Sequence, residues 1–235
     1  MSDDFLPPLH PDFHYRVDYI GNEKLPVLVV DNFLEGAEAL LGFAIKFGEF
    51  RDGLDFYPGI QSKVPDFYAN ALNLYLRDII CATFKITAEQ IHYSQSTYSM
   101  VLIPPAKLAI PQARPHVDTI SRNKLATVHY LCTPDKGGTS LYRHKATGFE
   151  SLNESRMALY SQYLEEEAKD TSWQKKYICG SNQYYEEIAR YEANFNRLIM
   201  YAGDVLHSAS IPENFTFVPN PRIGRLTLNS FIYCK

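Results

Sequence analysis

Hydrophobic positions recur with helical spacing in two stretches near the N-terminus. The stretch 35–50 predicts a helix through its apolar positions Leu40, Leu41, Ala44, Ile45 and Phe47. The stretch 65–84 keeps the same 3.6-residue period after a Pro-Asp start and predicts a second helix. A β-branched run at 26–34 predicts a strand before the first helix. Residues 1–24 carry three prolines and predict an irregular arm.

The pattern changes toward β structure in the second half of the chain. Short alternating or β-branched runs predict strands at 91–103, 125–132, 139–145, 196–203, 204–210 and 225–234. A Gly137-Gly138 turn precedes the third of these strands. Residues 146–195 return to a helical composition and predict a helical insertion, whereas the turn formers in 51–64 predict a loop.

This pattern predicts a mainly β protein with helices, of the α+β class. We expect one domain over residues 1–235, in which an N-terminal strand and helices (1–90) support an antiparallel β core (91–235). The core would be interrupted by the helical insertion at about 146–195. No repeat or low-complexity linker divides the chain, which favours one domain over two.

Composition and charge exclude several classes of protein. Apolar residues make up 46% and charged residues 21%, the balance of a soluble globular protein. The net charge is -4 without long basic runs, which argues against a nucleic-acid partner. No apolar run is long enough to span a membrane, and the N-terminal segment lacks the apolar core of a secretory signal. The four cysteines form no C-x-x-C pair. We therefore expect a cytoplasmic protein.

Three residues are candidate metal ligands. His116 and Asp118, in "RPHVDT", lie two positions apart, so in an extended segment both side chains point to the same face. An exposed polar turn at the start of a strand is the alternative for this pair. His207 ends an apolar strand after a Gly203-Asp204 turn. A lone histidine on such a strand is often structural.

Arg225 and Thr227 are candidates for binding an anion. They share one face of the final predicted strand, among apolar neighbours. An arginine that points inward at such a position is costly without an anionic partner. Arg222 is a rival, but Pro221 and Gly224 around it predict a loop, and only Arg225 is followed two positions later by threonine.

The order of these motifs resembles that of the iron(II)- and 2-oxoglutarate-dependent oxygenases, particularly their prolyl-hydroxylase-like branch. The resemblance rests on "RPHVDT", "KLATVHYLCTPDKGGTSLY", "NRLIMYAGDVLHS" and "GRLTLNSFI", with "VVDNFL" as the entry strand. It implies a double-stranded β-helix, the jelly-roll core shared with cupins. It also implies an Fe(II) site formed by His116, Asp118 and His207.

The same resemblance implies the cofactor site. Arg225 and Thr227 would bind the distal carboxylate of 2-oxoglutarate, and Tyr98 would add a hydrogen bond unless it is a core aromatic. The chain departs from the family in two ways. Arg225 stands where the branch often has lysine, and it lies further beyond His207 than is usual. Asp118, which a halogenase would lack, is present.

Three further residues are candidates for contacting the substrate. Tyr57 lies in the turn-rich loop, His129 on a predicted strand and Arg143 after the double-glycine turn. Their alternatives are a packed loop, a core histidine and a solvated surface. With 2-oxoglutarate and O₂ as co-substrates, the resemblance implies hydroxylation of a peptidyl, amino-acid or small-metabolite C–H bond. A cupin-like metal enzyme without 2-oxoglutarate and a non-catalytic jelly-roll binding protein remain alternatives. The sequence indicates neither the substrate nor the oligomeric state.

Overall fold

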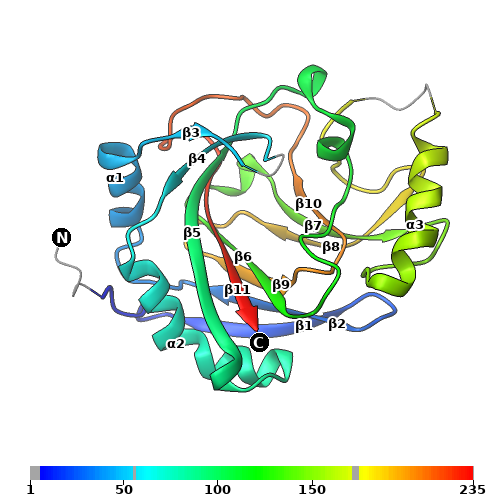
Figure 1. Ribbon diagram of the computed structural model, residues 1–235. Coiled ribbons are helices and arrows are strands. Elements are labelled where there is room, and N and C mark those ends of the chain that lie inside the picture. The colour runs from blue at the N-terminus through cyan, green and yellow to red at the C-terminus, as the bar shows by residue number, and fades with distance from the viewer. Residues whose placement is uncertain (1–5, 55–56, 171–174, 235) are drawn as a thin grey trace.

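Two antiparallel β-sheets form the centre of the molecule in the computed structural model, which describes residues 6–54, 57–170 and 175–234 (Figure 1). The larger sheet contains, in spatial order, β1 (His14–Ile20), β2 (Leu25–Asp31), β9 (Leu198–Ala202), β6 (Lys124–Tyr130), β11 (Leu226–Cys234), β5 (Ile91–Val101), β4 (Gly59–Lys63) and β3 (Arg51–Asp52). The smaller sheet contains β10 (His207–Ser210), β7 (Gly138–His144) and β8 (Tyr185–Glu192).

The chain alternates between the two sheets, and this gives the jelly-roll topology. It passes from β6 in the larger sheet to β7 and β8 in the smaller, returns to β9, crosses to β10 and returns to β11. The sheets face each other, since the Tyr130 hydroxyl on β6 donates to Thr139 Oγ1 on β7 at 2.7 Å. The predicted double-stranded β-helix is confirmed.

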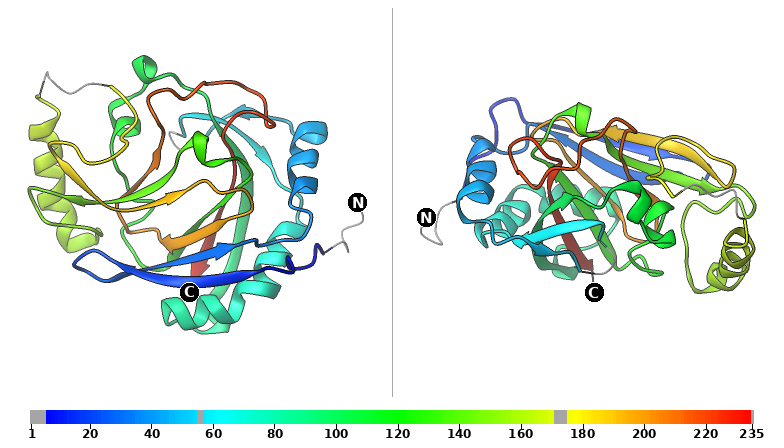
Figure 2. Two further views of the ribbon diagram at one scale, coloured as in Figure 1. Left: turned by 180° about the vertical axis from the view of Figure 1, so that it is seen from behind. Right: turned by 90° about the horizontal axis from the view of Figure 1, so that it is seen from above.

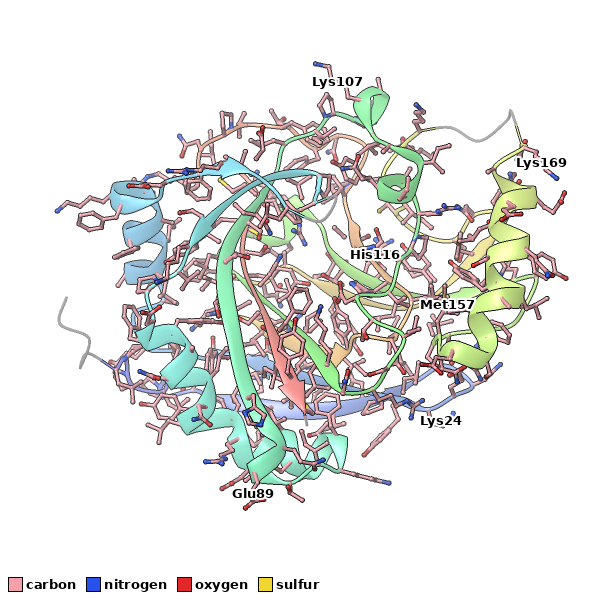
Figure 3. The ribbon with its side chains drawn as sticks, viewed as in Figure 1. Lys24, Glu89, Lys107, His116, Met157 and Lys169 are labelled. Atoms are coloured by element: carbon pink, nitrogen blue, oxygen red, sulfur yellow. The ribbon has the colours of Figure 1, made fainter. Side chains whose placement is uncertain are left out.

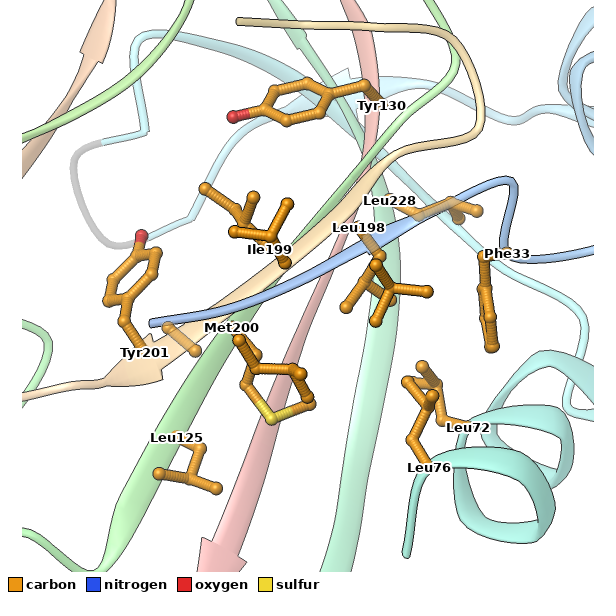
Figure 4. Close-up of a cluster of buried hydrophobic side chains, with 14 of the residues drawn as sticks. Phe33, Leu72, Leu76, Leu125, Tyr130, Leu198, Ile199, Met200, Tyr201 and Leu228 are labelled. Atoms are coloured by element: carbon orange, nitrogen blue, oxygen red, sulfur yellow. The ribbon is translucent and has the colours of Figure 1, made fainter. Parts of the chain in front are cut away.

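Two helices cover the other face of the larger sheet. They are α1 (Glu38–Phe47) and α2 (Phe67–Phe84), and Figure 1 shows both on the side of the molecule opposite α3 (Glu154–Glu167). The Tyr98 hydroxyl on β5 donates to the Leu40 carbonyl of α1 at 2.9 Å. Figure 4 shows Leu72 and Leu76 of α2 facing the leucines of the sheet. The central strands β6, β9 and β11 of the larger sheet are therefore largely buried on both faces.

The apolar spacing of α2 explains its position. Its buried residues recur at helical intervals and form one stripe toward the sheet: Phe67, Tyr68, Ala71, Leu72, Leu76, Ile80 and Thr83. The helix ends at Lys85, which adopts a left-handed conformation with φ of 56° and donates its backbone N–H to the Cys81 carbonyl. Both N-terminal helices lie where the sequence predicts them.

The double glycine at the start of β7, Gly137-Gly138, allows two strands to approach closely. A Cβ atom on Gly137 would lie 2.0 Å from the Ser210 carbonyl oxygen. A Cβ on Gly138 would lie 2.1 Å from the Tyr191 carbonyl oxygen. Both obstacles are backbone atoms that a side chain cannot displace, so glycine is required at both positions.

Three predictions about local structure are wrong. Residues 185–192 form strand β8 instead of a helix, because β7 offers them a free edge along which Tyr185 and Tyr191 become buried. The N-terminal arm contains β1, which pairs with β2 along its whole length (Figure 2). The predicted loop 51–64 contains β3 and β4, which extend the larger sheet beyond β5. Only α3 remains of the helical insertion among the described residues.

Short 3₁₀ turns join the main elements: η1 (Ala88–Gln90), η2 (Pro105–Lys107), η3 (Ile110–Ala113) and η4 (Pro134–Lys136). The second and third of these turns belong to the long connection between β5 and β6 that carries the candidate metal ligands. None of the helices described here is both long and apolar enough to cross a lipid bilayer.

Candidate metal centre

His116 and His207 face each other across an isolated antiparallel bridge. The N–H of His116 donates to the His207 carbonyl at 2.9 Å, and the reverse bond has the same length. Cross-strand partners project their side chains to the same side, and the two ring centroids lie 4.4 Å apart. Figure 3 shows His116 between the strands of the larger sheet and α3. Residues 116–118 form no regular strand, but the bridge alone brings both imidazoles together.

Asp118 completes a group of three ligand atoms. Its backbone N–H donates to the Gly203 carbonyl at 2.7 Å, which anchors it beside the turn before β10. Its carboxylate oxygens lie 3.9 Å from His116 Nε2 and 3.6 Å from His207 Nε2. One ligand atom from each residue lies within 4.8 Å of the others, a geometry that a single metal ion can bridge.

The hydrogen bonds of the two imidazoles suit metal ligation. His207 Nδ1 donates to the Val205 carbonyl at 2.9 Å, which leaves the lone pair of Nε2 directed at the group. Desolvation by surrounding atoms, followed by the nearby His207, lowers the pKa of His116. The neutral imidazole that results at pH 7 is the form that binds a metal.

The metal centre opens to solvent on one side. The side chain of His116 is 53% exposed, whereas those of Asp118 and His207 are 14% and 8% exposed. The two less exposed ligands face the space between the sheets. A molecule that reaches the metal from solvent therefore approaches over His116.

Arg225 is a buried cation without an anionic partner. It directly precedes β11, is 3% exposed and donates to the Gly138 carbonyl at 2.9 Å. Its Nε has no hydrogen-bond partner, and no ion pair joins it to a carboxylate within the part of the chain that the structure describes. A buried guanidinium left in this state is strongly unfavourable, so the geometry fits an anionic ligand here.

Other polar side chains gather around Arg225. Thr227 is fully buried, and its hydroxyl makes only a long 3.4 Å contact with the Ser99 carbonyl. The Tyr57 hydroxyl is buried without a hydrogen-bond partner. Burial raises the pKa of Tyr57 to about 12, and Arg225 opposes the shift, so the hydroxyl lies within the field of the guanidinium. Tyr57, expected to contact substrate, instead lies beside the candidate anion pocket.

Tyr201 links the metal centre to Arg225, a position that the sequence did not reveal. Its ring centroid lies 4.8 Å from that of His207. Burial raises the pKa of Tyr201, Asp118 raises it further, and Arg225 opposes the shift. Figure 4 shows Tyr130 and Tyr201 with their hydroxyls directed away from α2. The facing sides of the sheets therefore hold the metal ligands at one end and Arg225 at the other, with tyrosines between them.

Two of the predicted site residues lie on the opposite face of the larger sheet. The Tyr98 hydroxyl is bound to α1, and the His129 ring lies between Tyr68 Oη at 3.0 Å and Asn196 Oδ1 at 3.1 Å. Residues that pair directly across neighbouring strands point to the same face of the sheet. Thr227 pairs with Ser99 and Tyr130 and points toward the smaller sheet, whereas Tyr98 and His129 both pair with Leu228 and point the other way. We therefore correct both assignments, because the sheet separates these side chains from the metal centre.

Arg143 and Arg222, the other two arginines proposed from the sequence, both lie outside the candidate anion pocket. Arg143 donates through Nε to the buried carboxylate of Glu150 at 2.8 Å and through a terminal nitrogen to Glu186 at 2.6 Å. These ion pairs occupy its guanidinium, which corrects its assignment as a substrate residue. Arg222 is exposed on the loop before β11. Of the two arginines considered as the anion anchor, only Arg225 is buried.

A cavity of about 800 Å³ lies elsewhere, between α1, β4 and the start of α2. Phe43, Phe47, Lys63 and Phe67 contribute to its lining, whereas neither the candidate metal ligands nor Arg225 do. Its position on the helix side of the larger sheet separates it from the chemistry between the sheets.

A family model described as "Family of unknown function (DUF6445)" matches residues 11–232. The chain belongs to this family. No curated protein matches its sequence. The matched region includes the candidate metal ligands and Arg225, so the whole candidate site lies within the part of the chain that the DUF6445 model describes.

Solved structures that resemble this DUF6445 protein share little sequence with it. A non-heme α-ketoglutarate-dependent carbocyclase, SnoK from nogalamycin biosynthesis, is 8% identical, with 90% of this chain and 81% of that chain covered and a TM-score of 0.49. HygX from Streptomyces hygroscopicus, solved with nickel and 2-oxoglutarate bound, is 10% identical, with coverages of 91% and 84% and a TM-score of 0.48.

A Pseudomonas putida prolyl-4-hydroxylase is 14% identical to the chain. The match covers 91% of this chain and 95% of that chain, with a TM-score of 0.48. Such low identities and TM-scores assign no activity to the DUF6445 protein. Its chemistry has to be inferred from its own side chains.

Proposed function

We propose that this DUF6445 protein is an Fe(II)- and 2-oxoglutarate-dependent oxygenase that hydroxylates a C–H bond of a peptide, amino acid or small metabolite. The observation that carries the proposal is buried Arg225, whose Nε has no partner and whose charge has no counter-ion among the described residues. Because this cation lies behind a His-Asp-His group, a dicarboxylate that also binds the metal suits both ends of the space.

The donor groups present fit both ligands. Two imidazole nitrogens and one carboxylate form the set that non-heme Fe(II) takes, with further positions free for other molecules. The unpaired Nε of Arg225 and the unpaired hydroxyl of Tyr57 are buried polar atoms that a distal carboxylate would satisfy. Thr227 lies on the same strand face and adds a hydroxyl.

When bound, iron and 2-oxoglutarate supply the oxidation: O₂ converts 2-oxoglutarate to succinate and CO₂, and the second oxygen atom enters the substrate as a hydroxyl group. The protein supplies position. The Val205 carbonyl orients His207, the bridge aligns His116 with it, and Arg225 would hold the distal carboxylate of 2-oxoglutarate. Tyr130 and Tyr201 line the space between and exclude water. No side chain is assigned as general acid or base.

Anaerobic calorimetric titration of the metal-free protein with Fe(II), and then with 2-oxoglutarate, tests the proposal. We expect stoichiometric metal binding that His207→Ala abolishes, followed by 2-oxoglutarate binding that Arg225→Gln weakens by about 2–5 kcal/mol. Arg222→Gln is the matched control, since this exposed arginine lies on the same loop and should leave both affinities unchanged.

The outcomes separate the proposal from its alternatives. Metal binding without 2-oxoglutarate binding would indicate a cupin-like metal enzyme with another co-substrate. Failure to bind either ligand would leave a non-catalytic jelly-roll protein. Normal 2-oxoglutarate affinity in Arg225→Gln would reject Arg225 as the anchor, and succinate formation coupled to O₂ uptake would support the full proposal.

A further inference from the structure

Strand β1 forms one edge of the larger sheet. It stands first in the spatial order of that sheet, and among the described strands only β2 borders it (Figure 1). The backbone N–H and C=O groups on the other side of β1 therefore have no strand partner in the part of the chain that the structure describes. Such an edge is a template on which another chain can add a strand.

The chain on both sides of this edge is well fixed. All seven residues of β1, from His14 to Ile20, pair with β2. The turn between the two strands is held by the buried carboxylate of Glu150, whose oxygens accept the backbone N–H groups of Asn22 and Glu23 at 2.9 Å. An added strand thus meets an edge that is already in the conformation for pairing, which reduces the entropy lost on association.

Apolar side chains on one face of β1 are poorly covered. Tyr15, Val17 and Tyr19 alternate along the strand and point to the helix side of the larger sheet. The two tyrosines are 51% and 62% exposed. Because contact with a neighbouring strand would remove part of this aromatic surface from water, the exposed row favours association at this edge.

The opposite face of β1 carries one cation and one anion. The side chains of Arg16 and Asp18 are 49% and 34% exposed. Arg16 Nε lies 3.2 Å from Asp18 Oδ1 on the same strand, and a terminal nitrogen of Arg16 lies 3.4 Å from Asp31 Oδ2. Exposed ion pairs of this kind contribute little to stability, so both groups can turn to opposite charges on a second molecule.

The order of these residues makes β1 complementary to itself about Val17. If two copies pair antiparallel around a two-fold axis at Val17, each residue faces the one at equal distance on the other side of Val17. Arg16 then faces the partner's Asp18, and Tyr15 faces the partner's Tyr19. Opposite charges and aromatic rings directly across two strands each stabilise the pair.

The same two charges disfavour the neighbouring two-fold registers. An axis at Arg16 would place two guanidinium groups opposite each other, and an axis at Asp18 would place two carboxylates opposite each other. Like charges directly across two strands are destabilising. Of these three registers, only the one centred on Val17 pairs opposite charges.

We propose that the protein forms a two-fold symmetric homodimer in which β1 of each copy pairs antiparallel with β1 of the other, centred on Val17. The larger sheets of the two copies then form one continuous sheet. The partner is a second copy of this chain, because the edge matches its own sequence in both its charged and its aromatic positions. The dimer does not depend on the proposed function, since β1 contains neither the candidate metal ligands nor Arg225.

Sedimentation equilibrium of the wild type and of two charge variants tests this inference. We expect a wild-type dimer whose dissociation constant rises at least about tenfold in Arg16→Asp and in Asp18→Arg, because each substitution places like charges opposite each other twice in the dimer. Arg51→Asp is the matched control. Arg51 is 84% exposed on β3, the other edge strand of the same sheet, so its substitution should leave the dimer intact.

An equimolar mixture of the two charge variants gives the sharpest measurement. One chain then carries two anions on β1 and the other carries two cations, so a heterodimer regains opposite charges at both positions. We expect the mixture to dimerise about as tightly as the wild type, which variants that had lost their fold would not do. A mixture that stays monomeric overturns the inference.

Three other results would also overturn it. A monomeric wild type would leave the β1 edge to a strand of a different protein. A dimer that persists in both charge variants would use another surface. A dimer lost in Arg51→Asp would place the interface at the β3 edge of the sheet.

Discussion

The ring of His129 lies between α2 and the larger sheet, whereas the next residue, Tyr130, faces the metal side. Because successive residues of a strand point to opposite faces of the sheet, a shift of one position decides which side chains form the site. The sequence shows the alternation along β6, but not its direction, because positions on both faces of this strand are largely buried and each face mixes apolar and polar residues. The same ambiguity hides the choice between Tyr98 and Ser99.

Burial of His129 makes the stability of the protein depend on pH. Desolvation lowers the pKa of His129 to about 4, against a smaller opposite effect of its bond to Asn196. The unfolded chain takes up a proton below a pH of about 6.5, while the folded protein does not until about pH 4. The free energy of unfolding should therefore fall between these values, by up to about 1.4 kcal/mol per pH unit.

Urea unfolding of the wild type at pH 7 and pH 5 measures this loss, and His129→Gln should reduce it. His92→Gln, at an exposed position of β5, is the matched control. An unaltered loss of stability in His129→Gln would show that other groups cause the acid sensitivity.

Among the elements, those with strong local signals could be predicted from sequence. The apolar stripe of α2 and the β-branched run of β2 each predict the element and its buried residues from local sequence, and the structure contains both elements. β8 has no such signal: it contains several helix-favouring charged residues, and only pairing with β7 makes it a strand. β1 likewise depends on β2. Pairing with a strand that is distant in sequence or carries the stronger signal makes β8 and β1 strands, and a short stretch of sequence does not show this pairing.

Helix α3 should open more readily than α2. Only Tyr160 and Glu167 of its 14 residues are buried, whereas α2 buries seven of 18 along the sheet. Fewer buried contacts lower the free energy of local opening. We expect hydrogen-exchange mass spectrometry to show faster exchange for the peptide spanning 154–167 than for 67–84 under native conditions. Equal protection of the two helices would contradict this expectation.

At the scale of the whole molecule, the site joins distant parts of the chain. The metal ligands could be proposed from the order of motifs, because each carries its chemistry in its residue type. Tyr201 could not, and Tyr57 was expected to contact the substrate instead of lying beside Arg225, since tyrosines among 17 gain a role only through the side chains they approach in space. The sequence thus contains the ligands of the site but not its walls.

Metal binding should stabilise the folded protein, because the three ligands come together only after folding. Zn(II), which avoids oxidation, should raise the free energy of unfolding by about 2.7 kcal/mol at a hundredfold excess over its dissociation constant. Thermal unfolding with increasing Zn(II) measures the effect. His116→Ala should lose it, whereas Arg225→Gln should keep it because Arg225 does not bind the metal. A shift of the same size in His116→Ala would place the metal elsewhere.

The position of β11 has a consequence for synthesis on the ribosome. This strand lies between β5 and β6, yet it follows both by a long stretch of chain. Because a nascent chain emerges N-terminal end first, β5 and β6 each keep an unpaired edge until β11 appears, and such edges favour association between chains. Arg225 emerges just ahead of the strand that closes this gap. We therefore expect closure of these edges and completion of the candidate anion pocket in the same step of translation.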